Sequence, residues 1–145
     1  MDDLRYEELT GGNLLFKTLD QTAREKVIDL ARAKTYTKGE VIIEQGAEGD
    51  EIFLLRMGMV DVQTMQEGFV VELNTLKPGT IFGEVAEVSG VRRTATVVAQ
   101  ADVEVLVFPG HELVEELRQH PTASKLLDHI VLHRAQDTIS KTFGD

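Results

Sequence analysis

The chain has 145 residues, 42% of them hydrophobic and 28% charged, so it is long enough for one domain with its own core and too short for two ordinary domains. Its net charge of −10 argues against direct binding to nucleic acid, and the absence of Cys excludes disulfides, thiolate nucleophiles and Cys-based zinc sites. The acidic N-terminus lacks the apolar core of a signal peptide, and no run of about 18 apolar residues predicts a membrane span, so we expect a cytoplasmic protein.

Residues 1–33 are predicted to form an N-terminal helical segment. Within residues 13–33, Asp20 is suited to be a helix N-cap because its carboxylate can accept from free backbone N–H groups. The apolar residues that follow it recur at helical spacing: Val27, Ile28, Leu30 and Ala31. This part of the chain is therefore expected to be an amphipathic helical lead-in.

From Lys34 the chain changes to short β-rich runs separated by Gly, Asp, Pro and Asn. These runs read TYT, EVIIEQG, EIFLLRMG, MVDVQT, FVVELNTL, RTATVVAQ and VEVLVF. Short strands with regular turn signals are typical of a barrel or sandwich. In the last run, Val103, Val105 and Val107 alternate with Asp102, Glu104 and Leu106, which predicts one inward face and one largely outward face.

From Pro109 the pattern is helical again. Residues 109–120 predict one short helix, and Pro121 stands at the natural start of a second. The second helix carries a broad apolar stripe: Leu126, Leu127, Ile130, Val131 and Ile139. Because no linker, change of composition or internal repeat interrupts the chain, residues 1–145 are predicted to be one domain.

A search for catalytic groups gives no constellation, so we expect no enzyme activity. His129 and His133 have the i, i+4 spacing of zinc ligands on a helix, but two ligands are too few and a surface or interface pair is the better interpretation. A cupin-type metal-binding enzyme would have a similar number of strands. It needs His and Glu ligands on barrel strands, however, and all 4 histidines follow Gly110.

The stretch FGEVAEVSGVRRTATV, residues 82–97, interrupts the strands with a short predicted helix over residues 84–89, ended by Gly90 as a left-handed C-cap. A helix N-terminus followed by arginines suits an anion, because both offer N–H donors and positive charge. In the alternative interpretation, Glu84 complements the helix dipole and the arginines form a surface ion pair. The residues alone leave both interpretations open.

The same stretch resembles the phosphate-binding cassette of the cyclic nucleotide-binding domains of catabolite-activator-type regulators, protein kinase A regulatory subunits and nucleotide-gated channels. Residues 39–62 are similar to the β-roll signature of that family, with glycines at its turn positions: Gly39, Gly46, Gly49 and Gly58. The resemblance covers about residues 13–135. It implies a mainly β, α+β fold. An eight-stranded antiparallel, jelly-roll-like β-roll would cover residues 34–108, with the phosphate-binding cassette at residues 82–95. A helical segment over residues 1–33 would precede the roll, and two helices in residues 109–145 would follow it.

The resemblance also implies roles for individual residues. Backbone N–H groups of Gly83 and Ala86 would face the cyclic phosphate, Glu84 would accept from the ribose 2′-hydroxyl, and Arg93, rather than its exposed neighbour Arg92, would pair with the phosphate. The full expected ligand-binding set is Phe82, Gly83, Glu84, Val85, Ala86, Arg93, Thr94 and Ala95, with Val62 and Leu73 either walling the base pocket or simply filling the barrel core. The expected lid over the base consists of Leu126, Leu127, Ile130, Val131 and Arg134. No metal and no cofactor other than the nucleotide is expected.

The function that follows is that of a cyclic nucleotide sensor acting through movement of its C-terminal helix. The ligand would be cAMP, with cGMP left open because Thr94 is similar to a threonine that can reach guanine in some relatives. An unidentified protein partner would receive the signal, and a homodimer is left open. A ligand-free interaction module on the same fold is the alternative. Glu87 departs from the family pattern, which has an apolar residue there, so the packing between cassette and C-terminal helix is expected to differ.

Overall fold

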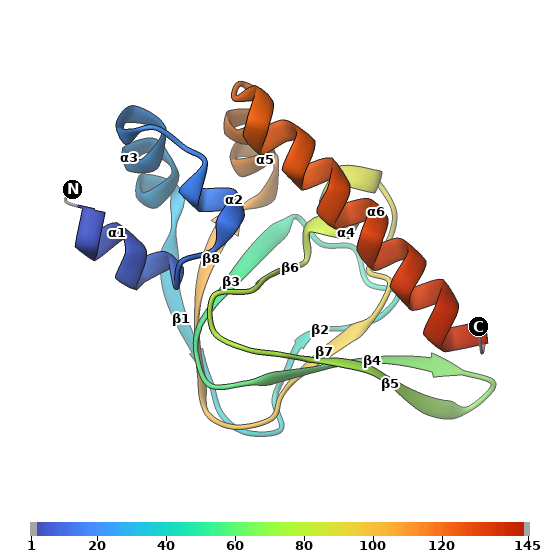
Figure 1. The fold of residues 1–145 in the computed structure, drawn as a ribbon. Coiled ribbons are helices and arrows are strands. Elements are labelled where there is room, and N and C mark those ends of the chain that lie inside the picture. The colour runs from blue at the N-terminus through green and yellow to red at the C-terminus, as the bar shows by residue number, and fades with distance from the viewer. Residues whose placement is uncertain (1–2, 144–145) are drawn as a thin grey trace.

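The computed structural model describes residues 3–143, with side chains from Leu4 to Arg134. Three helices come first, eight strands with one helix among them follow, and two helices end the described chain (Figure 1). The helices are α1 Asp3–Thr10, α2 Leu14–Lys17, α3 Gln21–Leu30, α4 Glu84–Ser89, α5 Gly110–Arg118 and α6 Pro121–Phe143. The strands are β1 Arg32–Tyr36, β2 Val41–Ile43, β3 Glu51–Met57, β4 Val60–Gln66, β5 Phe69–Leu76, β6 Ile81–Phe82, β7 Thr96–Ala99 and β8 Val103–Pro109.

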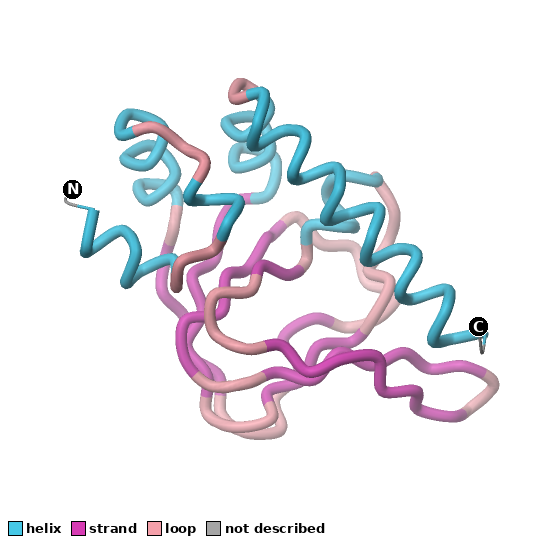
Figure 2. Tube along the Cα trace, in the orientation of Figure 1, coloured by secondary structure: helices cyan, strands magenta, loops and turns pink. Residues whose placement is uncertain are grey.

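The strands form two antiparallel four-stranded sheets in the orders β1-β8-β3-β6 and β2-β7-β4-β5. We call the first the helix-covered sheet and the second the outer sheet. Figure 2 shows the helices gathered on one side of the strands, with α6 running across the open end of the roll. The predicted eight-stranded β-roll with flanking helices is confirmed. Strand β6, only two residues long, gave no local signal, because alternation cannot be recognised over that length.

The N-terminal boundary differs from the prediction. Residues 13–33 form two separate helices, α2 and α3, and α3 ends at Leu30. Asp20 caps α3, because its side chain accepts from the Ala23 N–H at 2.9 Å. Strand β1 then begins at Arg32 rather than at Lys34. Four of its five residues are exposed, so its own hydrophobicity does not define it. Antiparallel pairing with β8, from Arg32 opposite Val107 to Tyr36 opposite Val103, decides the conformation.

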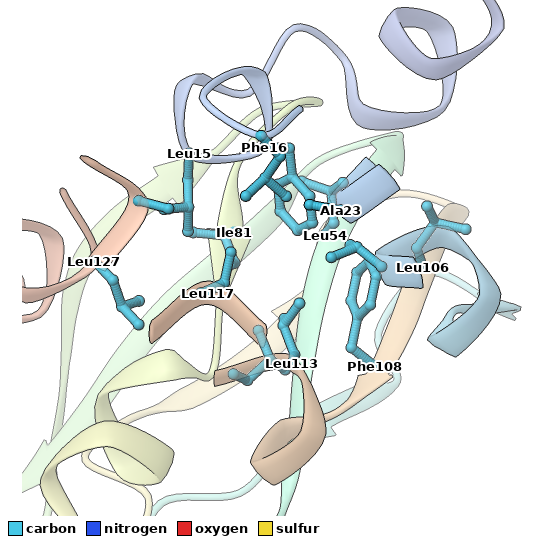
Figure 3. Packing of buried hydrophobic residues seen from close by; sticks show 14 of the residues in the cluster. Leu15, Phe16, Ala23, Leu54, Ile81, Leu106, Phe108, Leu113, Leu117 and Leu127 are labelled. Atoms are coloured by element: carbon cyan, nitrogen blue, oxygen red, sulfur yellow. The ribbon is translucent and has the colours of Figure 1, made fainter. Parts of the chain in front are cut away.

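The core has two parts that share the helix-covered sheet. One lies between that sheet and the helices, where Leu54 of β3, Phe108 of β8 and Leu127 of α6 are completely buried (Figure 3). The other lies between the sheets and includes Leu55 and Val105. Strands β3 and β8 are thus buried on both faces. The prediction that β8 has a largely outward face is wrong, because Leu106 and Phe108 lie under the helices, which local alternation cannot reveal.

Candidate ligand-binding site

Helix α4 connects the two sheets, since it follows β6 of the helix-covered sheet and precedes β7 of the outer sheet. It spans Glu84–Ser89, as predicted, and Gly90 ends it in a left-handed conformation with φ 66°, donating to the Ala86 carbonyl at 3.0 Å. Gly83 at its start has φ 88° and lies close to Arg93: an added Cβ would be 3.0 Å from Nη1. The conformation therefore favours glycine at position 83, and the space beside it is tight.

Glu84 is the most unusual side chain of the site, because it is a carboxylate with an exposed fraction of 0%. Its Oε1 accepts from Nη1 of Arg134 on α6 at 2.6 Å, whereas Oε2 has no partner among the described residues. Burial raises the pKa of Glu84, and the positive charges of Arg134 and Arg93 partly oppose this. A buried acceptor without a donor is costly, so this oxygen is suited to meet a ligand hydroxyl.

Arg93 is the buried member of the arginine pair, with an exposed fraction of 7%. Its guanidinium donates to the carbonyls of Gly83 at 2.8 Å and Glu51 at 2.9 Å. Burial lowers its pKa, and the nearby charges of Glu51 and Asp50 oppose the shift. The guanidinium also packs on Gly49 so closely that an added Cβ there would lie 2.2 Å from Nε. These contacts fix a desolvated positive charge at the start of α4.

Arg92 lies in a different environment although it is adjacent in sequence. Its side chain is 67% exposed and forms a 3.4 Å ion pair with Glu48. A second contact runs from Nη1 to the carbonyl of Gly46 at 3.2 Å. The surface ion pair considered for both arginines thus describes Arg92 but not Arg93.

These groups surround a cavity of about 320 Å³ between α4, α6 and the outer sheet. All ten expected ligand-binding residues line it: Val62, Leu73, Phe82, Gly83, Glu84, Val85, Ala86, Arg93, Thr94 and Ala95. Val62 also packs against the core between the sheets, and Leu73 is buried, while the contact of both residues with a base stays a prediction. Sequence analysis missed four further lining residues: Ile43, Asn74, Leu76 and Val97.

Of the expected lid residues, only Arg134 lines the cavity. Leu127 and Val131 are buried in the core between the helices and the sheet, and Leu126 and Ile130 pack against that core. Arg134 lies further along α6, where the helix extends towards β5 (Figure 1). In this conformation, therefore, Leu126, Leu127, Ile130 and Val131 hold α6 on the domain, while Arg134 reaches the cavity. The side chain of Ile139, the last residue of the predicted apolar stripe, lies outside the described side chains.

The cavity has a polar end and an apolar end. Glu84, Arg93 and Arg134 form the polar end, where two positive charges face one carboxylate. Val62, Leu73 and Leu76 of the outer sheet form the apolar end. Such a site suits a ligand that joins an anion, a hydroxyl group and a flat apolar ring.

Other candidate features give no second site. The rings of His129 and His133 stack with centroids 6.1 Å apart, and both residues are exposed. Across the described side chains, no group of three or more His, Asp or Glu residues is arranged to hold a metal ion. None of the helices between residues 3 and 143 is long and apolar enough to cross a membrane.

Comparison with known proteins agrees with this geometry. The family model described as the cyclic nucleotide-binding domain matches residues 33–120. The chain belongs to this family. The cAMP-dependent protein kinase type II regulatory subunit of Drosophila melanogaster is 35% identical over 112 residues, which are 77% of this chain and 30% of that relative. The chain spans about a third or less of the length of the curated relatives that it matches.

Solved structures show the same fold. A structure of "Sp-2Cl-cAMPS bound to PKAR CBD2" has a TM-score of 0.74 and 25% identity, and the match covers 96% of this chain and 90% of that chain. The catabolite activator protein of Thermus thermophilus has a TM-score of 0.73 and 26% identity, covering 85% of this chain and 58% of that chain. The likeness therefore extends beyond the cassette to the β-roll and its helices.

Proposed function

We propose that this domain is a cyclic nucleotide sensor that binds cAMP, with cGMP as a second ligand to be tested, in the cavity between α4, α6 and the outer sheet. One observation carries the proposal: Glu84 is wholly buried with an unpartnered oxygen in the same cavity as the buried Arg93. A domain without a ligand gains nothing from two desolvated charges beside a cavity.

Each part of a cyclic nucleotide has a complementary group in the cavity. Arg93 uses two of its nitrogens for carbonyl contacts, and its guanidinium has further N–H groups that can donate to a cyclic phosphate. The Oε2 atom of Glu84 can accept from a ribose hydroxyl. The base is then directed to the apolar end, against Val62 and Leu73.

The signal would pass to α6 through the contact between Glu84 and Arg134. This ion pair joins the cassette helix to the C-terminal helix across 50 positions of sequence. A ligand bound beside Glu84 changes the surroundings of that pair, and it shifts α6 to the extent that it binds one helix position better than another. The proposed output is a movement of α6, which a protein partner detects.

The partner and the assembly belong to the same proposal. The curated relatives are named as regulatory subunits of a kinase, which favours a regulatory role in this chain rather than a catalytic one. An unidentified downstream protein in the cytoplasm would respond to α6, and a homodimer of the domain is left open by the proposal. Size-exclusion chromatography with and without cAMP tests the homodimer directly.

Isothermal titration of the purified, nucleotide-free domain with cAMP and with cGMP tests the function. Saturable binding of either compound at one site per chain is the expected result. If folded protein binds neither compound, the proposal is wrong and the ligand-free interaction module becomes the better interpretation. Metal analysis of the same sample tests the cupin-type alternative.

A further inference from the structure

Strand β5 contains an irregularity at the apolar end of the cavity. Val62 of β4 pairs with Asn74, but the next residue, Gln63, pairs with Glu72, so Leu73 is an extra residue in the β5 strand. In a regular strand, successive side chains point to opposite faces. Here Leu73 and Asn74 both line the cavity. The bulge thus places a polar amide beside apolar residues that would otherwise form this wall alone.

Asn74 differs chemically from every other residue that lines the cavity. It is the single carboxamide among the described lining residues, and it lies on the same strand as the apolar Leu73 and Leu76. Its Oδ1 accepts from the Thr75 N–H at 2.9 Å, which leaves the second lone pair of that oxygen. The amide nitrogen carries two further donors. Asn74 therefore presents an acceptor and a donor side by side.

An acceptor beside a donor matches one purine better than the other. Adenine presents its N6 amino group as a donor next to N7 as an acceptor, a pair that an Asn amide contacts with two hydrogen bonds. Guanine presents O6 and N7, which are both acceptors, so the Oδ1 of Asn74 would face another acceptor. The amide thus discriminates by the pattern of donors and acceptors and not by size.

The base reaches this wall because the other parts of the ligand are fixed elsewhere. The phosphate is held at Arg93 and the ribose at Glu84, both on the cassette side of the cavity. The remaining space is bounded by Val62, Leu73 and Leu76 of the outer sheet, with Asn74 among them. A planar base stacked against these apolar residues therefore turns one edge towards the amide.

We infer that Asn74 contacts the edge of the purine base and gives the site a preference for adenine over guanine. This inference rests on the proposed function, because it requires a cyclic nucleotide in the cavity. It assigns the base preference to β5, whereas Thr94 of the cassette leaves both bases open. Because Asn74 is exposed to water, which competes for its hydrogen bonds, the expected preference for cAMP over cGMP is only roughly 5- to 20-fold.

The test compares three nucleotides on three proteins by isothermal titration. The nucleotides are cAMP, cGMP and 7-deaza-cAMP, which lacks the N7 acceptor. The proteins are the wild type, Asn74→Ala and, as a matched control, Glu72→Ala, since Glu72 is exposed on the same strand and does not line the cavity. Circular dichroism confirms that each protein is folded.

For the wild type and Glu72→Ala, we expect cAMP to bind roughly 5- to 20-fold more tightly than cGMP, and 7-deaza-cAMP several-fold more weakly than cAMP. In Asn74→Ala, all three affinities should converge to within about twofold. This inference would be overturned, but not the proposed function, if Asn74→Ala kept the wild-type ratio of cAMP to cGMP affinity. The same holds if Asn74→Ala still bound 7-deaza-cAMP more weakly than cAMP by the wild-type factor. Failure of the wild type to bind any of the three compounds would overturn the proposed function, and this inference with it.

Discussion

The two sheets of this domain have different tasks although each contains four antiparallel strands. In the helix-covered sheet, β3 and β8 are buried on both faces, between the helices and the outer sheet. The outer sheet packs on one side only and leaves a cavity of about 320 Å³ between itself and helices α4 and α6. Stability is concentrated where packing is complete, and the candidate site lies where packing stops.

The largest effect that would test this contrast is in the helix-covered sheet. Phe108 is completely buried and packs against Phe16, with the two rings tilted and their centroids 5.4 Å apart. Phe108→Ala should lower the free energy of unfolding by roughly 3 to 5 kcal/mol, because it leaves a cavity in a packed core. Phe69→Ala on the outer sheet, where Phe69 is 73% exposed, should change it by less than about 0.5 kcal/mol. Urea denaturation measures both, and equal losses would refute the contrast.

The next effect concerns ligand binding rather than stability. Arg93→Ala should weaken binding of cAMP by roughly 2 to 5 kcal/mol, because the phosphate charge is left unpaired at a desolvated site. The matched control is Arg92→Ala, which removes a 67% exposed neighbour and should change the affinity less than about twofold. Titration calorimetry measures both affinities. Equal losses in the two variants would mean that the buried arginine has no special role.

The buried Glu84 of the candidate site should make the stability of the protein depend on pH. Burial raises its pKa above the ordinary 4.5, so over a pH interval that begins near 4.5 the folded protein keeps a proton that the unfolded chain releases. The wild type should therefore lose stability as the pH rises above about 4.5, relative to Glu84→Gln, which has no such proton to release.

The stability of Glu84→Gln relative to the wild type should rise as the pH rises above about 4.5 and should stay constant at lower pH. Urea denaturation at a series of pH values follows the difference, and titration with cAMP should show weaker binding. A constant stability difference across this range would show that Glu84 does not titrate as inferred.

The smallest effect lies where α4 meets α5. The carboxylate of Glu87 lies against Gly110, the first residue of α5, so closely that a Cβ on Gly110 would be 2.9 Å from Oε2. A negative charge near a helix N-terminus is favourable, so Glu87→Gln should lower the free energy of unfolding by about 0.3 to 1 kcal/mol. Thermal unfolding at low and high salt measures it, with the loss smaller at high salt. A loss independent of salt would point to packing instead.

Local sequence signals predicted the parts of the fold that depend on local interactions. Short β-rich runs separated by turn residues gave most strands, Asp20 gave a helix start, and the glycines around residues 84–89 gave the cassette helix. What was missed depends on pairing between distant segments. Strand β6 is defined by β3, the second buried face of β8 by the helices, and the orientation of Asn74 by a shift in register against β4.

The residues of the candidate site also fall into those that the sequence could predict and those that it could not. The cassette residues are consecutive in sequence and could be selected through their resemblance to a known motif. Arg134 could be proposed only as one member of a lid, because nothing in the sequence indicates which residue of a long helix meets Glu84. Leu127 belonged to the same expected lid, and the structure places it in the core instead.

Gly49 has a consequence for how this domain can vary. Its lack of a side chain leaves the space in which the Arg93 guanidinium rests, and its φ lies outside the left-handed range, so space alone requires glycine there. A methyl group at position 49 would meet the flexible end of Arg93 and not the backbone. The fold can absorb that collision by moving the guanidinium, and the cost would then fall on the proposed contact between Arg93 and the phosphate. Selection on the response to the nucleotide would therefore maintain a residue that neither touches the ligand nor supports the core.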